Sequence, residues 1–212
     1  MIIAVDGPTA SGKGTIAKRI AAHFGIAYLD TGLLYRAVGR QVAINEGDPD
    51  DPADALAACD FPDALMEDEN LRTEETGGLA SRVSVHPEVR KALFKRQRKF
   101  AEQPGGAVLD GRDIGTVIAP DADVKLFITA SVQERARRRW LEMIDKGIGT
   151  EDEIPLATIE RDIVDRDARD INRKDAPLKA APDALVIDTT SFDREAAFET
   201  VLEAVKTALE KR

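Results

Sequence analysis

The chain has 212 residues, of which 43% are hydrophobic and 33% charged, so it can bury the core of one α/β domain with insertions. Its formal net charge of −9 argues against a general binder of nucleic acids or acidic membranes, because both need a basic surface. The single cysteine, Cys59, excludes an intrachain disulfide and fits a reducing compartment. No apolar stretch resembles a signal peptide or a membrane span, and we therefore expect a cytoplasmic protein.

The first predicted element is a short apolar strand at 2–5, which runs into a Gly-x-x-x-x-Gly-Lys loop and then a helix. Glycines in such a loop let backbone N–H groups turn toward a phosphate, and the helix points the positive end of its dipole at the same anion. Lys13 adds a cation to this loop, which we expect to be solvated. The pattern predicts an ATP site formed by Gly7, Pro8, Thr9, Ala10, Ser11, Gly12, Lys13, Gly14 and Thr15.

Apolar runs and helical patterns alternate along the rest of the chain. Further strands are predicted at 27–29, 107–109, 124–128 and 184–187, and helices at 12–24, 32–45, 87–100, 132–146, 156–168 and 194–211. Short strands that are apolar throughout indicate a parallel sheet covered on both faces. We therefore predict an α/β protein of the P-loop type, in which a five-stranded parallel sheet flanked by helices forms a single domain over 1–212.

Two segments interrupt this alternation. Residues 46–86 begin with an acidic, proline-containing break and show no firm period at 61–70, which predicts a small insertion on the sheet domain. Residues 147–153 separate two charged helices, which predicts the tip of a mobile helical hairpin. This hairpin, 132–173, is the candidate lid.

Several strands end in an acid, and the carboxyl ends of parallel strands are where such sheets bind ligands. Asp110 follows the third strand, where a carboxylate reaches Mg²⁺ directly or through water. The residue after Lys13 is Gly14, so the nearest hydroxyl comes one place later, at Thr15. Thr15 and Asp110 are therefore the candidate residues for Mg²⁺, bound as Mg-ATP.

Charged residues also follow the second and third strands. Thr31 and Arg36 begin a helix there, which indicates a second anion site facing the loop or, alternatively, a helix cap and a solvated arginine. Gly111 permits a sharp turn that would direct Arg112 and Asp113 into the cleft, although a plain salt bridge is the competing interpretation.

The two helices of the hairpin are rich in arginine. Arg135, Arg138 and Arg139 share one helical face, where a triphosphate would relieve their repulsion; pairing with nearby acids is the alternative. Arg166, Asp170 and Arg173 would share a face of the next helix if that helix continues beyond 168; Arg161 and Arg169 add further cations, and a solvated charged helix is the alternative. Phosphoryl transfer needs cations around the moving group, and both segments can supply them.

Four strings together resemble bacterial cytidylate kinases, which belong to the nucleoside monophosphate kinase branch of the P-loop proteins. They are Asp-Gly-Pro-x-x-Ser-Gly-Lys-Gly-Thr, Tyr-Leu-Asp-Thr-Gly-x-x-Tyr-Arg, Asp-Gly-Arg-Asp-Ile-Gly-Thr-Val and Arg-Asp-x-x-Asp-x-Asn-Arg, in this order. The resemblance implies transfer of the γ-phosphoryl group of ATP to CMP, and to dCMP. The family usually carries a small β-sheet insert after the second helix, and the segment available here is too short for all of it.

The resemblance also implies roles for individual residues. It implies that Lys13, Arg112 and Arg166 are catalytic and that Arg138 and Arg139 belong to the lid and to the ATP site. The residues that it implies for CMP are Thr31, Arg36, Ser81, Arg90, Arg112, Asp113, Asp170 and Arg173.

Other functions share part of this pattern. A small P-loop kinase for UMP, AMP or a shikimate-like acceptor would have the same phosphate loop and differ only in the acceptor pocket. A nucleotide switch is disfavoured because the chain lacks Asn-Lys-x-Asp, and a polynucleotide end kinase is disfavoured by the acidic charge. We expect small-molecule substrates, no nucleic-acid or membrane partner, and a monomer.

Overall fold

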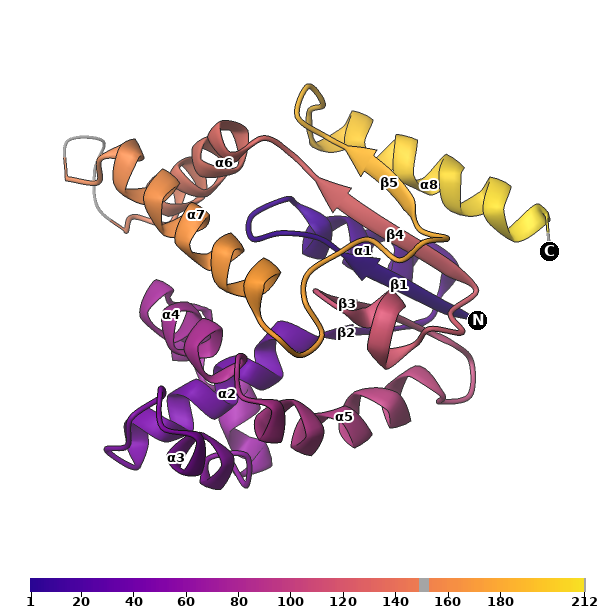
Figure 1. The fold of residues 1–212 in the computed structure, drawn as a ribbon. Helices are drawn as coiled ribbons and strands as arrows, with labels where there is room; N and C mark the ends of the chain where they lie inside the picture. Colours follow the sequence, from indigo (N-terminus) through magenta and orange to yellow (C-terminus); the bar gives the residue numbers. More distant parts are fainter. Residues whose placement is uncertain (149–152, 212) are drawn as a thin grey trace.

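The computed structural model describes residues 1–148 and 153–211, and Figure 1 shows their arrangement. Five parallel strands form one sheet in the order β2-β3-β1-β4-β5. Their bounds are β1 Ile2–Asp6, β2 Ala27–Asp30, β3 Ala107–Gly111, β4 Val124–Thr129 and β5 Leu185–Asp188. The prediction of a five-stranded parallel sheet is confirmed, each strand lying within one or two residues of its predicted bounds.

Helices cover both faces of this sheet. On one face, α1 (Lys13–Phe24) and α8 (Arg194–Glu210) bury a core that includes Ile3 and Val5 of β1. On the other face, α5 (Pro87–Ala101) and a π-helical turn at Ile114–Ile118 pack on Ala4 and Leu109. Because side chains of a strand alternate between faces, burial of both sets explains why these strands are apolar throughout. The edge strand β5 is the exception, since most of its residues are exposed.

The insertion is helical. After α2 (Thr31–Ile44) come α3 (Pro52–Ala57), two 3₁₀ turns at Asp63–Glu67 and Glu69–Arg72, and α4 (Glu74–Val83), which share their own core with α2 and α5. No helix is predicted from the sequence at the position of α4. The helix forms because it packs closely on α2: a side chain at Gly39 would approach Cβ of Leu79 to 2.8 Å.

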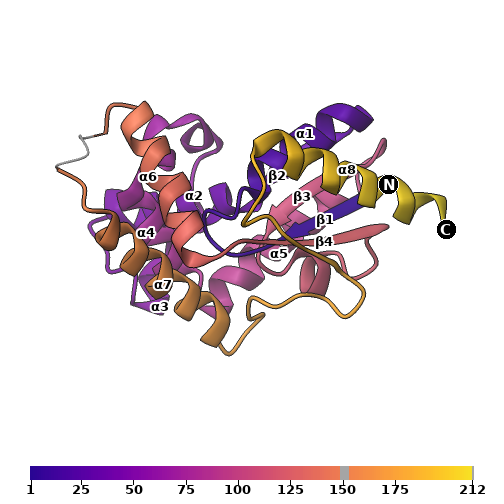
Figure 2. The same ribbon diagram turned by 90° about the horizontal axis from the view of Figure 1, so that it is seen from above.

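The hairpin consists of α6 (Val132–Asp145) and α7 (Leu156–Asn172). Ala136, Ile159 and Ile163 form its small core, against which Trp140 and the loop residue Ala10 pack. Figures 1 and 2 show the hairpin and the insertion side by side at one end of the molecule, with both termini at the other. Residues 149–152, which include most of the expected tip of the hairpin, lie outside the described residues. Over 1–148 and 153–211, every helix is too short or too polar to cross a membrane.

Candidate active site

The loop between β1 and α1 has the backbone that a phosphate site needs. Gly12 lies at the N-terminus of α1 with φ +85°, and a side chain at Gly7 would collide with the Ile128 carbonyl oxygen at 2.0 Å. Ala10 also has a positive φ, of 59°. Gly12 adopts a left-handed backbone and Gly7 a close-packed one, and glycine provides both at least cost. The loop therefore opens its N–H groups at the positive end of α1.

Lys13 is buried rather than solvated, contrary to the expectation from sequence. Its Nζ lies 3.5 Å from the Pro8 carbonyl oxygen. Burial, followed by the positive charge of Arg112, lowers the pKa of Lys13 to about 8. Keeping the buried Lys13 side chain protonated therefore costs free energy. An anion bound in the loop would offset this cost, because it would stabilise the positive charge.

Asp110 lies beside this loop at the end of β3. Burial and the neighbouring Asp30 raise its pKa to about 6, and the Tyr28 hydroxyl donates to its Oδ2 at 2.8 Å. A Cβ at Gly14 would lie 3.0 Å from the same oxygen, so the first turn of α1 passes close to the carboxylate. Thr15, one residue further, is exposed. Asp110 offers the hard oxygen that Mg²⁺ prefers, although within 1–148 and 153–211 no three or more acidic, His or Cys side chains are arranged so that they could hold a metal ion by themselves.

Arg36 and Arg166 meet from different elements. Arg36 donates through Nη1 to the carbonyl oxygens of Leu71 and Thr73, at 2.8 Å each, which holds its guanidinium in place. A Cβ at Gly77 would lie 2.8 Å from Nη2 of Arg36 and 3.1 Å from Nη2 of Arg166. The absence of a side chain at Gly77 thus leaves room for the two guanidinium groups to approach the same point.

These cations repel one another. Burial and then the nearby charge of Arg166 lower the pKa of Arg36 to about 10, and burial and Arg139 lower that of Arg166. Arg112 adds to the repulsion on both. The carboxylate of Glu74 lies between Arg139 and Arg166 and pairs with both. A cluster of this kind is a ready site for phosphate groups.

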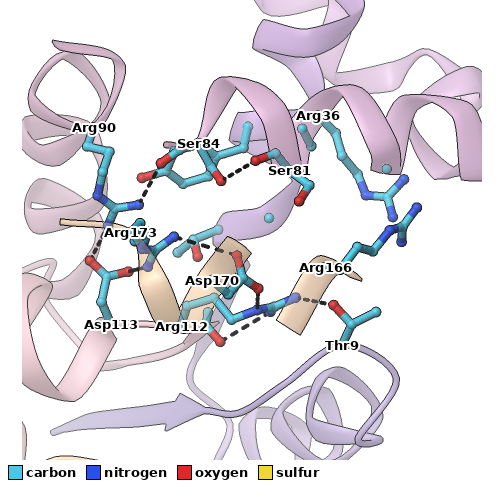
Figure 3. A pocket seen from close by; sticks show the side chains of 16 residues that line it. Thr9, Arg36, Ser81, Ser84, Arg90, Arg112, Asp113, Arg166, Asp170 and Arg173 are labelled. Atoms are coloured by element: carbon cyan, nitrogen blue, oxygen red, sulfur yellow. Dashed lines mark hydrogen bonds and ion pairs between the residues drawn. The ribbon is translucent and has the colours of Figure 1, made fainter. Parts of the chain in front are cut away.

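Arg112 connects the loop between β1 and α1 to helix α7 of the hairpin. Its Nε donates to Oδ2 of Asp170 on α7 at 2.7 Å, and its Nη2 donates to the Thr9 hydroxyl at 2.9 Å (Figure 3). Thr31 is held against the end of β3, because its hydroxyl donates a hydrogen bond to the Asp110 carbonyl oxygen at 2.7 Å. The salt bridge considered as an alternative for Arg112 is therefore present, with Asp170 as its partner.

The other half of the pocket is built around Asp113. Arg90 and Asp113 are both buried and form an ion pair through Nη2 and Oδ2, while Arg173 lies 3.7 Å from the other carboxylate oxygen. Ser81 lines the same pocket from α4, and Tyr35 lies under the Arg90 guanidinium at 5.6 Å. Figure 3 shows these side chains converging with Arg36, Arg112 and Arg166. The residues that sequence analysis assigned to CMP all line this one pocket.

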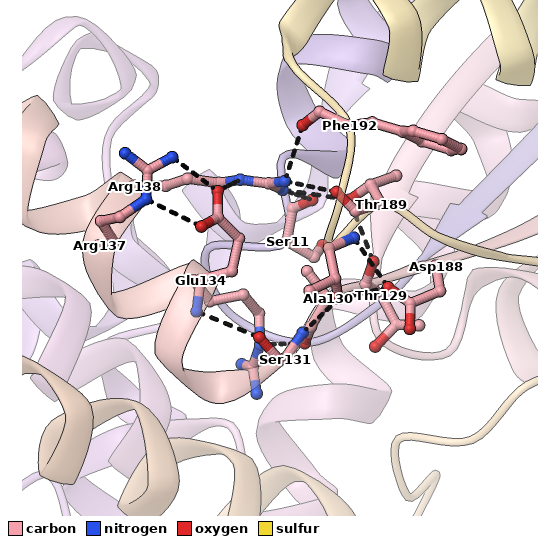
Figure 4. Close-up of polar contacts among 12 residues, drawn as sticks. Ser11, Thr129, Ala130, Ser131, Glu134, Arg137, Arg138, Asp188, Thr189 and Phe192 are labelled. Atoms are coloured by element: carbon pink, nitrogen blue, oxygen red, sulfur yellow. Dashed lines mark hydrogen bonds and ion pairs between the residues drawn. The ribbon is translucent and has the colours of Figure 1, made fainter.

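The arginines of α6 do not form one free cationic face. Arg135 is buried, pairs with Asp167 at 2.7 Å and donates to the Thr9 carbonyl oxygen at 2.9 Å. Arg138 pairs with Glu134 at 2.9 Å and donates to the Thr189 carbonyl oxygen at 2.6 Å (Figure 4). The alternative of pairing with nearby acids is thus what the structure has. Arg138 nonetheless reaches the phosphate loop, with Nη1 3.5 Å from the Ser11 carbonyl oxygen.

Asp6 is a positioning residue that sequence analysis noticed only as an acid at a strand end. Its two carboxylate oxygens accept the backbone N–H groups of Ile114 and Gly115, each at 2.8 Å. These bonds fix the turn that carries Arg112 and Asp113. Burial is the largest effect on the carboxyl group and raises its pKa to about 7.

This pKa gives a pH-dependent contribution to stability. The folded state binds a proton on Asp6 below about pH 7 and the unfolded state only below about pH 4, so stability falls as the pH rises between them. Between pH 5 and 7, the free energy of unfolding of the wild type should fall by about 2 kcal/mol more than that of Asp6→Asn. Denaturant unfolding of both proteins at pH 5, 6, 7 and 8 measures this difference.

Asp121→Asn is the control, because Asp121 is exposed and its partner Arg98 holds the pKa of Asp121 at about 2. Above pH 5, the free energy of unfolding of that variant should change with pH in the same way as that of the wild type. Parallel curves for Asp6→Asn would contradict an ionisation of Asp6 near neutrality.

Some residues of the site had no signal in the sequence. Glu74 and Thr189 bind arginines of α6 through contacts that join distant parts of the chain. In the sequence, Tyr28 stands out only as the first residue of the Tyr-Leu-Asp-Thr-Gly-x-x-Tyr-Arg motif, and Arg169 only as one further cation of its helix. Gly77 was the available signal for the paired cations, since glycine within a helix often marks a close approach.

Comparisons with known proteins agree with this geometry. The profile of the family described as cytidylate kinase matches residues 3–207. A cytidylate kinase of Cereibacter sphaeroides (strain KD131) is 55% identical over 204 residues, which are 96% of this chain and 94% of the relative. One of Methylocella silvestris is 51% identical over 214 residues, with 98% and 95% covered.

Among solved structures, an uncharacterized protein from Eubacterium ventriosum aligns over 100% of this chain and 99% of its own, with a TM-score of 0.55 and 16% identity, which supports the fold alone. Sequence and site together place this chain in the cytidylate kinase family of P-loop kinases.

Proposed function

We propose that this chain transfers the γ-phosphoryl group of ATP to CMP and to dCMP through the pocket between the phosphate loop, the insertion and the lid. Family membership fixes the reaction class as phosphoryl transfer to CMP. The observation that carries the residue roles is one pocket with repelling arginines at one side and the buried Arg90–Asp113 pair at the other. One side fits phosphates and the other fits a base.

The cationic side performs the transfer in this proposal. Lys13 and the loop N–H groups hold the ATP phosphates, and Arg138 and Arg139 close over them from α6. Arg36, Arg112 and Thr31 hold the phosphate of CMP, so that it faces the γ-phosphoryl group. Arg112 and Arg166 then neutralise charge on the moving group, a contribution that reaches about 10³–10⁵ in rate for a single arginine in this class of reaction.

Mg²⁺ is the metal that a reaction on ATP requires. Asp110 and Thr15 would hold it, directly or through water, and the ion would neutralise charge on the phosphates of ATP. The buried, acceptor-only carboxylate of Asp110 beside α1 supports this assignment. The Tyr28 hydroxyl keeps that carboxylate in one orientation.

The other side of the pocket reads the nucleoside. Asp113 and Ser81 both accept hydrogen bonds from the N4 amino group of cytosine, and Arg90 donates a hydrogen bond to N3 or O2. Asp170 and Arg173 approach the sugar, where Asp170 also holds Arg112. The helical insertion supports Ser81 in place of the β-sheet that the family usually carries.

An acceptor panel tests this function. With Mg-ATP, CMP and dCMP should be phosphorylated with a kcat/KM at least about 10-fold above that for UMP, AMP or shikimate, the scale of one good base contact. Coupled detection of ADP with each acceptor measures this. Faster turnover of UMP or AMP would assign the pocket to another nucleotide, and an oligonucleotide acceptor serves as the control for end-kinase activity.

Closure of the lid is expected to accompany substrate binding. Amide hydrogen exchange in α6 and α7 should slow when CMP and a non-hydrolysable ATP analogue are added together, because phosphates bridge Arg138, Arg139 and Arg166 to the rest of the site. The helix α8, which lies outside the pocket, is the internal control. Unchanged exchange in α6 and α7 would contradict a lid.

A further inference from the structure

Arg169 links the lid to the base-reading side of the pocket. It lies on α7, half-buried, and its Nε donates to the Ser81 hydroxyl oxygen at 2.9 Å. Ser81 stands on α4, 88 residues away in the sequence. The same α7 carries Arg166 one turn before Arg169 and Asp170 directly after it, so its one face serves both sides of the pocket.

The direction of this hydrogen bond is fixed by chemistry. A guanidinium has five N–H donors and no lone pair, and it stays protonated at any physiological pH, so Ser81 can only accept from it. A serine side chain otherwise rotates among three staggered positions. A charge-assisted bond at this distance selects one of them, in which one lone pair and the proton of the hydroxyl remain for other partners.

The position of Ser81 makes this selection relevant to the base. Ser81 lines the pocket together with Asp113 and Arg90, and Figure 3 shows all three among the side chains around that pocket. Arg169 itself does not line the pocket. It therefore acts on a bound nucleotide through Ser81 and not by direct contact.

We propose that Arg169 is a positioning residue: it holds the Ser81 hydroxyl for the cytosine base and thereby makes base selection depend on the position of α7. The lid must be closed for the bond to exist, because the donor and acceptor belong to α7 and α4. A base that fits then stabilises the same closed position in which Arg166 reaches the phosphates. This inference rests on the proposed role of Ser81 in binding CMP.

A double-mutant cycle tests it. Values of kcat/KM for CMP and UMP are measured for the wild type, Arg169→Ala, Ser81→Ala and the double variant. Each single substitution should lower the CMP-over-UMP ratio about 10-fold, the effect of losing one hydrogen bond. The double variant should lower it no further than Ser81→Ala alone, because Arg169 acts only through Ser81.

Arg161→Ala is the matched control, since Arg161 is an exposed arginine on the same helix and its loss should leave the ratio unchanged. Arg169→Lys, which keeps the positive charge on α7, should lower the ratio less and replaces the alanine variant if that variant is unstable. A merely structural role of Arg169 would lower kcat/KM for CMP and UMP by the same factor, and that result would overturn the inference.

The outcomes separate this inference from the proposed role of Ser81. If Ser81→Ala lowers the ratio and Arg169→Ala does not, Ser81 reads the base unaided and the inference is wrong. If neither variant changes the ratio while Asp113→Asn does, Ser81 has no part in base reading and its assignment to CMP fails. Additive effects in the double variant would show that Arg169 acts by a route other than Ser81.

Discussion

Replacing Lys13 with alanine should lower kcat by at least about 10²–10³-fold, the scale of losing one preorganised charge at a transition state. The Lys13 ammonium is buried in the loop next to Arg112, and its lowered pKa shows that its charge is costly in the free protein. When a triphosphate is bound, its negative charge compensates the buried Lys13 charge, and the two groups stabilise one another. In the protein without nucleotide the buried charge only destabilises the fold, so the substitution should not lower the melting temperature.

Lys18→Ala is the matched control, because Lys18 is exposed on the same helix. It should keep the turnover of the wild type. Steady-state kinetics with saturating CMP and a thermal melt of each purified protein make the comparison. Near-normal turnover of Lys13→Ala would refute the assignment of the loop to ATP.

Replacing Asp113 with asparagine should narrow the preference for CMP over UMP by roughly 1–3 kcal/mol in kcat/KM, the value of one good base contact. Cytosine presents an N4 amino donor to the carboxylate, whereas uracil presents the O4 acceptor, which the carboxylate repels. Uracil also sets its N3–H against the donors of Arg90. Asparagine offers a donor at the same position, so the penalty on uracil falls and the contact with cytosine weakens.

The stability of this variant has to be measured alongside its kinetics. Asp113 pairs with Arg90 and lies near Arg173, and loss of its charge leaves two buried guanidinium groups less well compensated. Asp175→Asn is the control, because Asp175 is an exposed partner of Arg90, at 3.5 Å from Nε. Equal losses for CMP and UMP in Asp113→Asn would mean that Asp113 does not read the base.

The proposed phosphate loop follows from local sequence more directly than the proposed base-reading side of the pocket. The loop, its strand and its helix are contiguous in sequence, so the pattern at residues 7–15 predicts a phosphate site without knowledge of the rest of the fold. The pairing of Arg90 with Asp113 joins residues 23 apart, and that of Arg169 with Ser81 joins residues 88 apart. No spacing rule of a helix or strand relates such residues, so only family resemblance could name them in advance.

The arginines of α6 illustrate the limit of a helical pattern. Spacing predicts which side chains share a face, and Arg135, Arg138 and Arg139 do so. It does not predict which acids the rest of the chain brings to that face. Asp167 of α7 and Glu74 of α4 are such acids, whereas Glu134 lies on α6 itself, four residues before Arg138, so that helical spacing does predict its pairing.

The sequence by itself determined the sheet, the phosphate loop and the convergence of strand ends, because hydrophobic period, glycine spacing and strand polarity are encoded over a few residues. The tertiary structure decided that 74–83 is a helix, that Lys13 is buried, and that Asp6 fixes the turn before Ile114. Helix α4 contains two glycines and little apolar surface, so its stability comes from packing on α2 and not from its own propensity. Burial and hydrogen-bond partners are properties of the packed molecule, and they set both the charges of this site and the residues that hold them.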